Sequence, residues 1–176
     1  QGKNIFLTGP GGTGKTYILN EFIKQYKTNI DNEDLSIAIT STTGSSASLL
    51  NGITLHSWGG IGLGKKLVDY YYEEITKNPT KKKNWVKANV LIIDEVSMLN
   101  PELFEKLDIL ARKIRKNSYP FGGIQLILSG DFCQLPNIES KEFCFESIVW
   151  DDLIEETYYF TEVLRQNDPL FLNILN

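Results

Sequence analysis

Short apolar runs and amphipathic segments alternate along the chain. The apolar runs are bounded by glycine, asparagine and other turn-forming residues, a pattern typical of buried strands. The segments between them place apolar residues three and four positions apart, which predicts helices with one buried face. The predicted strands are 4–8, 35–40, 89–93 and 124–129, with a β-rich stretch at 157–161. The predicted helices are 16–27, two pieces of 65–87 broken at Asn78-Pro79, 101–116 and 169–175, while 42–64 is expected to hold a helix and a long functional loop.

Strands that alternate with helices predict an α/β fold, in which a parallel sheet carries helices on both faces. The chain of 176 residues suits one domain that buries a core without disulfide or metal crosslinks. No internal repeat or low-complexity linker divides it, so we expect 1–176 to form a single unit.

Composition excludes several classes of protein. With 41% hydrophobic and 23% charged residues, the chain is neither disordered nor fibrous. No apolar run approaches the roughly 18–20 residues of a membrane span, so we expect no membrane partner. Cys133 and Cys144 are too few for a disulfide scaffold or a four-ligand zinc site, which favours an intracellular, reducing compartment.

The net charge of −4 is unevenly distributed. Residues 1–116 carry a net charge of +4, and residues 117–176 carry −8. Twelve of the basic residues fall between Lys65 and Lys116. They form either solvated helix faces or a basic surface that faces a polyanion, and charge alone favours the first interpretation.

The most specific motif is a glycine-rich loop that matches G-x-x-x-x-G-K-[ST] between a predicted strand and a predicted helix. Its glycines allow main-chain N–H groups to surround a phosphate, and the following helix presents its positive end. The lysine can reach the β- and γ-phosphates of ATP, and the threonine hydroxyl can bind Mg²⁺. The loop consists of Gly9, Pro10, Gly11, Gly12, Thr13, Gly14, Lys15 and Thr16.

Two adjacent carboxylates supply the acidic partner that a phosphate loop needs. Asp94 and Glu95 directly follow the apolar run 89–93, which places them at the carboxyl end of a central strand. We expect Asp94 to hold Mg²⁺, and Glu95 to orient and deprotonate the attacking water. The pair favours an NTP hydrolase over a kinase, which would not need the second carboxylate.

Three further segments narrow the class of hydrolase. They are T-T-G-S-S-A with G-I-T-L-H-S-W at 42–58, G-D-F-C-Q-L-P at 130–136, and T-E-V-L-R-Q at 161–166. With the phosphate loop and D-E-V-S-M at 94–98, they make the chain resemble the PIF-one family of DNA helicases. These are superfamily 1 enzymes, related to RecD-like helicases, that move 5′-to-3′ on single strands. The likeness extends from the phosphate loop to Arg165.

The resemblance implies a RecA-like P-loop NTPase lobe and assigns roles within it. The phosphate loop would hold ATP and Mg²⁺, with Asp94 and Glu95 as the metal-binding and catalytic acids. Gln134 would sense the γ-phosphate and couple hydrolysis to movement. Arg165 would reach the γ-phosphate and neutralise charge that builds up during phosphoryl transfer.

The resemblance also implies a path for single-stranded DNA. Thr43, Gly44, Thr54 and His56 would line this path, with His56 in a structural or backbone-positioning role. Trp58 has two interpretations. It stacks on a base, as aromatic residues on single-strand surfaces do, or it packs its loop onto the lobe.

Superfamily 1 helicases use two RecA-like lobes with ATP in the cleft between them. We therefore expect the chain to be the first lobe, nearly inactive alone, with a second lobe elsewhere in the same protein. The resemblance implies single-stranded DNA and forks as partners, and roles in DNA repair, recombination and telomere maintenance. The location would be the nucleus or mitochondrion of a eukaryote, or the cytoplasm for a bacterial or viral protein.

Two alternatives stay open from the residues themselves. The chain belongs to a P-loop ATPase or small-molecule kinase with no role on DNA, or it is a module that binds nucleotide or DNA without turnover. A helicase motor should hydrolyse ATP faster when single-stranded DNA is added, whereas a P-loop ATPase or kinase with no role on DNA should not. A module that only binds nucleotide or DNA should show no ATP turnover at all.

Overall fold

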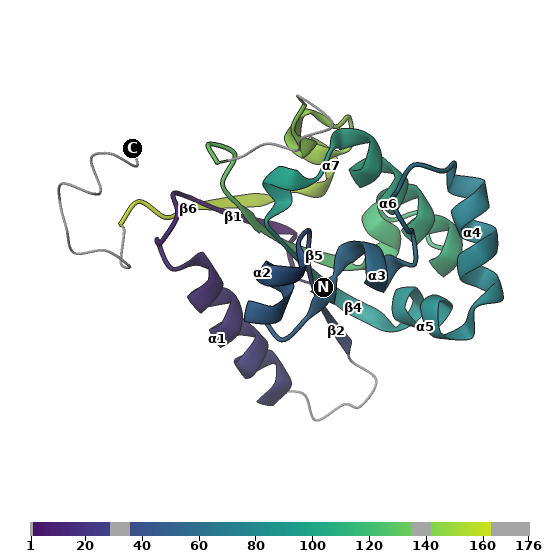
Figure 1. Cartoon of the computed structure of the whole chain (residues 1–176), viewed down its shortest axis with the longest axis horizontal. Helices are drawn as coiled ribbons and strands as arrows, with labels where there is room; N and C mark the ends of the chain where they lie inside the picture. Colours follow the sequence, from purple (N-terminus) through teal and green to yellow (C-terminus); the bar gives the residue numbers. More distant parts are fainter. Residues whose placement is uncertain (1, 29–35, 135–141, 163–176) are drawn as a thin grey trace.

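One parallel sheet organises the molecule. The structure, a computed structural model, describes residues 2–28, 36–134 and 142–162. In these ranges six strands pair in the order β3-β2-β4-β5-β1-β6, all parallel (Figure 1). The predicted parallel sheet is confirmed. The strands are β1 (Ile5–Thr8), β2 (Ser36–Ser41), β3 (Ile53–Thr54), β4 (Ala88–Asp94), β5 (Gln125–Gly130) and β6 (Glu156–Tyr159).

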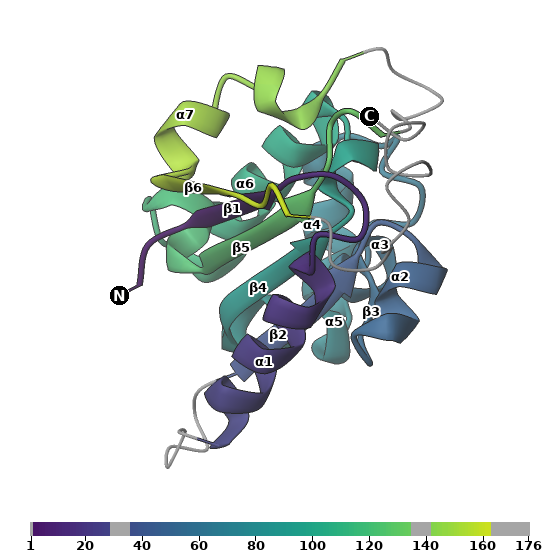
Figure 2. The same cartoon turned by 90° about the vertical axis from the view of Figure 1, so that its left-hand side faces the viewer.

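Helices cover both faces of this sheet, as predicted (Figure 2). The smaller core packs the sheet against α1, and the larger core packs the other face against α3 to α7. The α-helices are α1 (Lys15–Thr28), α2 (Gly44–Leu49), α3 (Leu55–Gly59), α4 (Val68–Lys77), α5 (Pro79–Lys87), α6 (Pro101–Arg115) and α7 (Trp150–Leu153). Short 3-10 turns are η1 (Val96–Met98), η2 (Pro120–Gly123) and η3 (Cys144–Glu146). Within the described ranges, no helix has the length and apolar character needed to span a bilayer.

The sequence of β4 is a continuous apolar run because both faces of this strand are covered. Leu91 and Ile93 point into the larger core, whereas Val90 and Ile92 point into the smaller one. All four side chains are buried, because alternate residues of a strand face opposite sides of the sheet and both sides are covered. The same burial fixes the position of the two carboxylates at its end.

The predicted break in the charged segment 65–87 is confirmed at Asn78. This residue ends α4, and its side chain then caps α5 by accepting a hydrogen bond from the Lys81 N–H at 3.1 Å. Pro79 occupies the first turn of α5, where its missing N–H costs no helical hydrogen bond. The helix boundary is therefore encoded by two adjacent residues.

The segment 42–64 contains more regular structure than the sequence predicted. It holds α2, the two-residue strand β3 and α3 in place of one helix and a long loop. Hydrophobic periodicity does not detect these elements because each is very short. The expected helix at 169–175 and residue Leu35 of the second predicted strand lie outside the described residues.

The basic residues of 65–116 differ in their surroundings: some are held by contacts within the fold, and others are exposed. On α6, Lys106 contacts the Gly64 carbonyl and the Glu102 carboxylate, and its side chain is only 13% exposed. Lys82, Lys83 and Lys87 on α5 are exposed. Arg115 is structural: it donates hydrogen bonds to the main-chain carbonyls of Trp85, Val86, Ala88 and Gly122.

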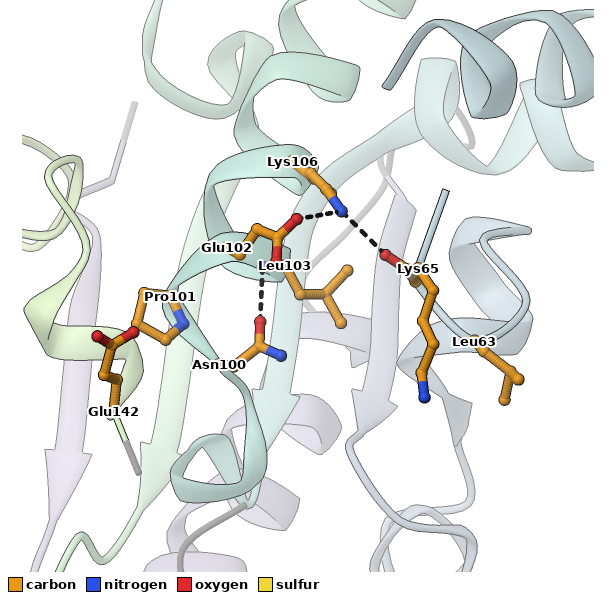
Figure 3. Close-up of a pocket in the computed structure, with 9 residues that line it drawn as sticks. Leu63, Lys65, Asn100, Pro101, Glu102, Leu103, Lys106 and Glu142 are labelled. Carbon is orange, nitrogen blue, oxygen red and sulfur yellow. Dashed lines mark hydrogen bonds and ion pairs between the residues drawn. The ribbon is translucent and has the colours of Figure 1, made fainter. Parts of the chain in front are cut away.

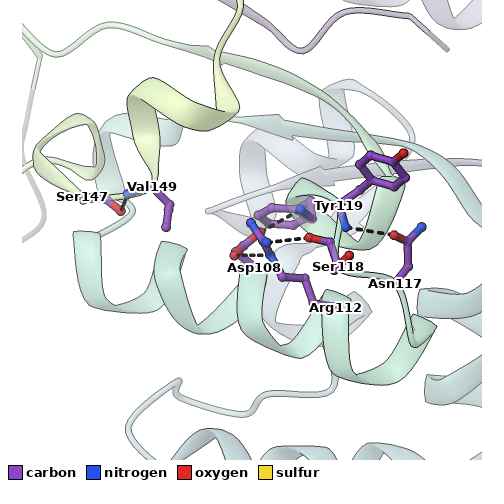
Figure 4. A network of polar contacts seen from close by, with 8 residues as sticks. Asp108, Arg112, Asn117, Ser118, Tyr119, Ser147 and Val149 are labelled. Carbon is purple, nitrogen blue, oxygen red and sulfur yellow. Dashed lines mark hydrogen bonds and ion pairs between the residues drawn. The ribbon is translucent and has the colours of Figure 1, made fainter.

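A buried carboxylate ties the end of α6 to the turn that follows it (Figure 4). Asp108, 3% exposed, accepts hydrogen bonds from the Phe121 N–H at 2.7 Å and from Arg112 Nε at 2.8 Å. Arg112 also donates to the Ser118 carbonyl at 2.7 Å. Phe121 has a φ of +50°, a strained backbone conformation for a bulky residue, and its ring is fully buried. Asp108 thus holds a strained turn in place.

We expect Asp108→Ala to lower the free energy of unfolding by about 2–4 kcal/mol, because it leaves a buried N–H unpaired and removes the partner of Arg112. Urea denaturation of the protein measures this loss. Asp151→Ala, which removes an exposed carboxylate from α7, is the matched control and should change stability by about 0.5 kcal/mol or less. Equal effects of the two substitutions would contradict the role given to Asp108.

Candidate nucleotide-binding site

Three segments that follow strands meet at the carboxyl edge of the sheet. They are the loop after β1, the carboxylate pair at the end of β4 and the turn after β5. This edge is where ligands bind in open parallel sheets. The three segments enclose a cavity of about 530 Å³, lined by Gly11, Gly12, Gly14, Lys15, Thr16, Tyr17, Asp94, Glu95, Asp131 and Gln134.

The phosphate loop has the conformation that its glycines permit. Gly9, Gly12 and Gly14 all have positive φ angles, of 144°, 82° and 93°. At Gly9 a Cβ atom would lie 2.2 Å from the Phe160 carbonyl oxygen, so no other residue fits there. Thr13 closes the loop by donating its hydroxyl to the Pro10 carbonyl at 2.9 Å. The loop is therefore shaped as a cradle for an anion at the start of α1.

Lys15 lies inside this cradle. Its Nζ atom donates hydrogen bonds to the carbonyls of Gly9 and Pro10, at the opposite end of the loop. Burial lowers the pKa of Lys15, while the nearby Asp131, Glu95 and Asp94 carboxylates oppose this shift. The ammonium group is thus partly desolvated and surrounded by carboxylates, which suits it to bind a phosphate that enters the cavity.

Asp94 is a buried carboxylate with the buried hydroxyl of Ser129 beside it. Its side chain is 4% exposed, and burial raises the pKa of its carboxyl against the opposing effects of Ser129 and Lys15. The Ser129 Oγ is buried too, and within the described residues it forms no hydrogen bond of ordinary geometry. Buried polar atoms usually have a partner, and a hydrated cation would supply one. This donor set, with the Thr16 hydroxyl lining the same cavity, fits Mg²⁺.

Glu95 is held in an unusual backbone conformation. Its φ of 56° and ψ of 43° lie in the left-handed region, where non-glycine residues are uncommon and cluster at functional sites. Burial raises the pKa of its carboxyl, and Asp94 raises it further, while Lys15 lowers it. A raised pKa makes this carboxylate a better proton acceptor near neutral pH. Position and basicity both suit a general base.

The end of β2 fixes the main chain of these two carboxylates. The Thr42 N–H and the Ser41 hydroxyl both donate to the Asp94 carbonyl at 3.1 Å, and the Thr42 hydroxyl donates to the Glu95 carbonyl at 2.8 Å. The sequence does not predict this role for Ser41 and Thr42. Their spacing carries no signal for it, because the contact joins segments about fifty residues apart.

The turn after β5 brings Gln134 to the cavity, and its role as a γ-phosphate sensor stays a prediction from the family resemblance. The Asp131 carboxylate accepts the Cys133 N–H at 2.9 Å, and the Asp131 carbonyl accepts the Gln134 N–H at 3.1 Å. A Cβ atom on Gly11 would lie 3.1 Å from Gln134 Nε2, so the amide faces the phosphate loop. Asp131 and Tyr17 also line the cavity, and the sequence did not predict either as a site residue. Arg165 lies outside the described residues.

Comparison with known proteins agrees with this geometry. A family model described as PIF1-like helicase matches residues 1–171. The chain belongs to the PIF1-like helicase family. The ATP-dependent DNA helicase PIF1 of Emericella nidulans is 45% identical over 182 residues, covering 100% of this chain and 24% of the relative. The PIF1-like chain thus spans about a quarter of that relative's length.

Solved structures of the family share the fold. The crystal structure of Pif1 helicase from Candida albicans superposes with a TM-score of 0.93 at 40% identity, covering 98% of this chain and 39% of that one. Pif1 helicase from Bacteroides in complex with ADP-AlF3 and ssDNA has a TM-score of 0.72 at 29% identity, covering 98% and 41%. The predicted RecA-like α/β fold is therefore confirmed for this PIF1-like chain.

The predicted DNA contacts of the PIF1-like chain lie at the same edge of the sheet, after β2 and β3. Thr43 caps α2 by accepting the Ser46 N–H at 3.3 Å, and Thr54 caps α3 by accepting the Ser57 N–H at 3.2 Å. A Cβ atom on Gly44 would meet nothing within 4 Å, so a ligand can approach the main chain there. Burial lowers the pKa of His56, which favours its neutral form. These four residues remain predicted DNA contacts.

Trp58 is the exception, and the structure corrects its place among the predicted DNA contacts. Its side chain is 5% exposed, and its ring packs against Trp85 with the centroids 4.7 Å apart. The Trp85 Nε1 donates to the Gly59 carbonyl at 2.9 Å, which anchors the end of α3. Of the two interpretations of Trp58, packing is therefore the one that the structure shows. A buried ring offers no free face for a base.

A second cavity of about 410 Å³ lies at the start of α6 (Figure 3). Asn100 caps this helix by accepting the Leu103 N–H at 2.7 Å, and Lys106 spans from Glu102 to the Gly64 carbonyl across the cavity. None of the predicted nucleotide or DNA residues lines it. The contacts of Lys106 join α6 to the segment after α3 and stabilise their packing.

Proposed function

We propose that the chain is the ATP-binding lobe of an ATP-dependent DNA helicase. The observation that supports this most directly is the cavity at the carboxyl edge of the sheet. It brings Lys15, Asp94, Glu95 and Gln134 together from three separate segments. Each has the charge or hydrogen-bonding capacity that phosphoryl transfer to water requires.

The residues of the cavity divide the chemistry between them. The main-chain N–H groups of the phosphate loop and Lys15 bind and orient the phosphates. Thr16 and Asp94 would hold Mg²⁺, which neutralises phosphate charge when it is bound. Glu95 orients the attacking water and accepts its proton at a carboxylate oxygen. Gln134 donates its amide to the γ-phosphate and loses that bond when the phosphate leaves.

Arg165 would complete the charge neutralisation. Its guanidinium is always protonated and presents several donors, which suits it to the developing negative charge on the γ-phosphate. The T-E-V-L-R-Q motif is the support for this role, since Arg165 lies outside the described residues.

We propose further that this lobe, residues 1–176, works with a second RecA-like lobe of the same protein. The chain covers 24% of the length of the PIF1 relative, which leaves ample sequence for that lobe. The Bacteroides relative was solved with ADP-AlF3 and ssDNA, which supports ATP and single-stranded DNA as ligands. Family resemblance supports movement 5′-to-3′ on single strands and action at forks. It also supports a location in a compartment that contains DNA, such as the nucleus or mitochondrion of a eukaryote.

Single-stranded DNA is expected to raise the ATPase rate of the full-length protein by about tenfold or more, because a motor couples hydrolysis to its track. Phosphate release with and without an oligo(dT) strand measures the effect. A blunt duplex of matched nucleotide content is the control and should stimulate far less. A rate that oligo(dT) leaves unchanged would favour a P-loop ATPase with no role on DNA.

A further inference from the structure

Among the described residues, the outer edge of β2 has a strand partner only at its carboxyl end. Strand β3 pairs with β2 at Thr40 and Ser41, and among the described residues no strand pairs with this edge at 36–39. A strand edge with free N–H and C=O groups is a template for another extended chain. This edge lies far along β2 from the nucleotide cavity, which contains no residue of it.

Hydrogen bonds on the inner side of β2 show which groups face outward. The Thr42 N–H donates to the Asp94 carbonyl at 3.1 Å, toward β4, and the pairing of β2 with β4 is regular from Ile37 to Ser41. Main-chain groups alternate in direction along a strand, so those of Ile37 and Ile39 point to the outer edge. At Ile39 the chain from α2 closes the edge, because a Cβ atom on Gly52 would lie 2.4 Å from the Ile39 carbonyl oxygen. The open part is therefore centred on Ile37.

A groove of about 540 Å³ runs along this open edge. Its opposite wall is one face of α5, formed by Thr80, Lys83, Asn84 and Lys87 at helical spacing. Both lysines are exposed and form no ion pair within the described residues. None of the described residues that line the groove is a carboxylate. The α5 wall that faces the strand edge therefore carries a local positive charge from Lys83 and Lys87.

The floor of the groove is partly apolar. Ile37 and Ile39 are half-buried along the edge, and Ile53 at one end is 48% exposed. An extended peptide alternates its side chains, so one set can cover these isoleucines while the other set reaches the lysines. The groove therefore matches a strand with apolar residues on one side and acidic residues on the other.

We propose that this groove binds an extended acidic segment of a partner protein, which adds as a strand to β2 beside α5. Peptide recognition by strand addition draws affinity from main-chain hydrogen bonds, and here charge would select acidic sequences. Single-stranded DNA is a poorer match, because it has no main-chain amides to pair with Ile37. The predicted DNA contacts Thr43 and Thr54 also lie past the opposite end of the strand.

The test uses full-length protein and a fluorescent peptide of alternating glutamate and valine. The peptide should bind, and the double substitution Lys83→Glu with Lys87→Glu should weaken it by about tenfold or more. Lys66→Glu with Lys116→Glu makes the same change of charge outside the groove and should keep affinity within about twofold. Thermal melting confirms that both variants are folded.

Two further measurements separate strand addition from attraction by charge alone. A peptide that is N-methylated on alternate amides keeps its charge but cannot pair with the edge, so it should bind about tenfold more weakly. Hydrogen exchange of the Ile37 amide should slow when the unmodified peptide is added. Equal affinity of the two peptides, unchanged exchange at Ile37, or full displacement of the peptide by oligo(dT) would each overturn the proposal.

Discussion

Glu95→Gln is expected to lower the ATP turnover of the full-length protein by about 10²- to 10⁴-fold while ATP affinity stays within about threefold. Glutamine has the size and hydrogen-bonding reach of glutamate, but it cannot accept the proton of the attacking water. It also tolerates the left-handed backbone at position 95 about as well, so the local geometry should persist. Phosphate release measures turnover, and equilibrium binding of a fluorescent ATP analogue measures affinity.

The control for this prediction is Glu73→Gln on α4, which changes an exposed carboxylate outside the cavity and should leave turnover unaltered. The pH profile gives a second readout. Because burial and Asp94 raise the pKa of Glu95, activity should fall on acidification at a higher pH than an ordinary glutamate would give. This fall should disappear in Glu95→Gln. Turnover like that of the unmodified protein would reject Glu95 as the base.

Lys15→Ala is expected to reduce kcat/KM for ATP by about 10²- to 10³-fold, with ATP binding weakened as well. The ammonium is a positive charge close enough to both carboxylates to lower the pKa of Asp94 and of Glu95. Its removal therefore also raises the pKa of the general base and concentrates negative charge in the cavity. Lys15→Ala should therefore weaken ATP binding, whereas Glu95→Gln should not. This difference distinguishes a residue that binds phosphate from one that accepts a proton.

Lys24→Ala is the matched control, because Lys24 lies on the same helix with its side chain exposed. Alanine favours a helix at least as well as lysine, so the control should keep full activity. Lys15→Met tests shape separately from charge, since it retains the aliphatic stem. If either Lys15 variant bound and hydrolysed ATP normally, the assignment of the phosphate loop would fail.

Much of the nucleotide site follows from local sequence. The phosphate loop and the Asp94–Glu95 pair are contiguous motifs beside apolar runs, and each run became the strand that was predicted. Phosphate cradles need main-chain geometry that a few adjacent glycines provide, so short-range sequence suffices to predict them. The break at Asn78 follows for the same reason, since capping acts within one turn.

Contacts between distant segments were decided by the tertiary structure alone. The hydrogen bonds from Ser41 and Thr42 to the main chain of Asp94 and Glu95 exist because β2 and β4 pair in one particular register. Trp58 was open to two interpretations until its packing against Trp85 on α5 placed it in the core. Motifs within a segment report the chemistry of that segment, but they do not report which segments become neighbours.

The sequence by itself therefore predicted the class of fold and the family, which are confirmed, and the residues proposed to bind phosphate, because each of these depends on patterns within a few adjacent residues. The tertiary structure decided how those residues are held and which surfaces stay open. The short pairing between β3 and β2 leaves the edge at Ile37 free, and the packing of α5 places Lys83 and Lys87 across from it. Both depend on strand register and helix packing, which form between parts of the chain that are distant in sequence.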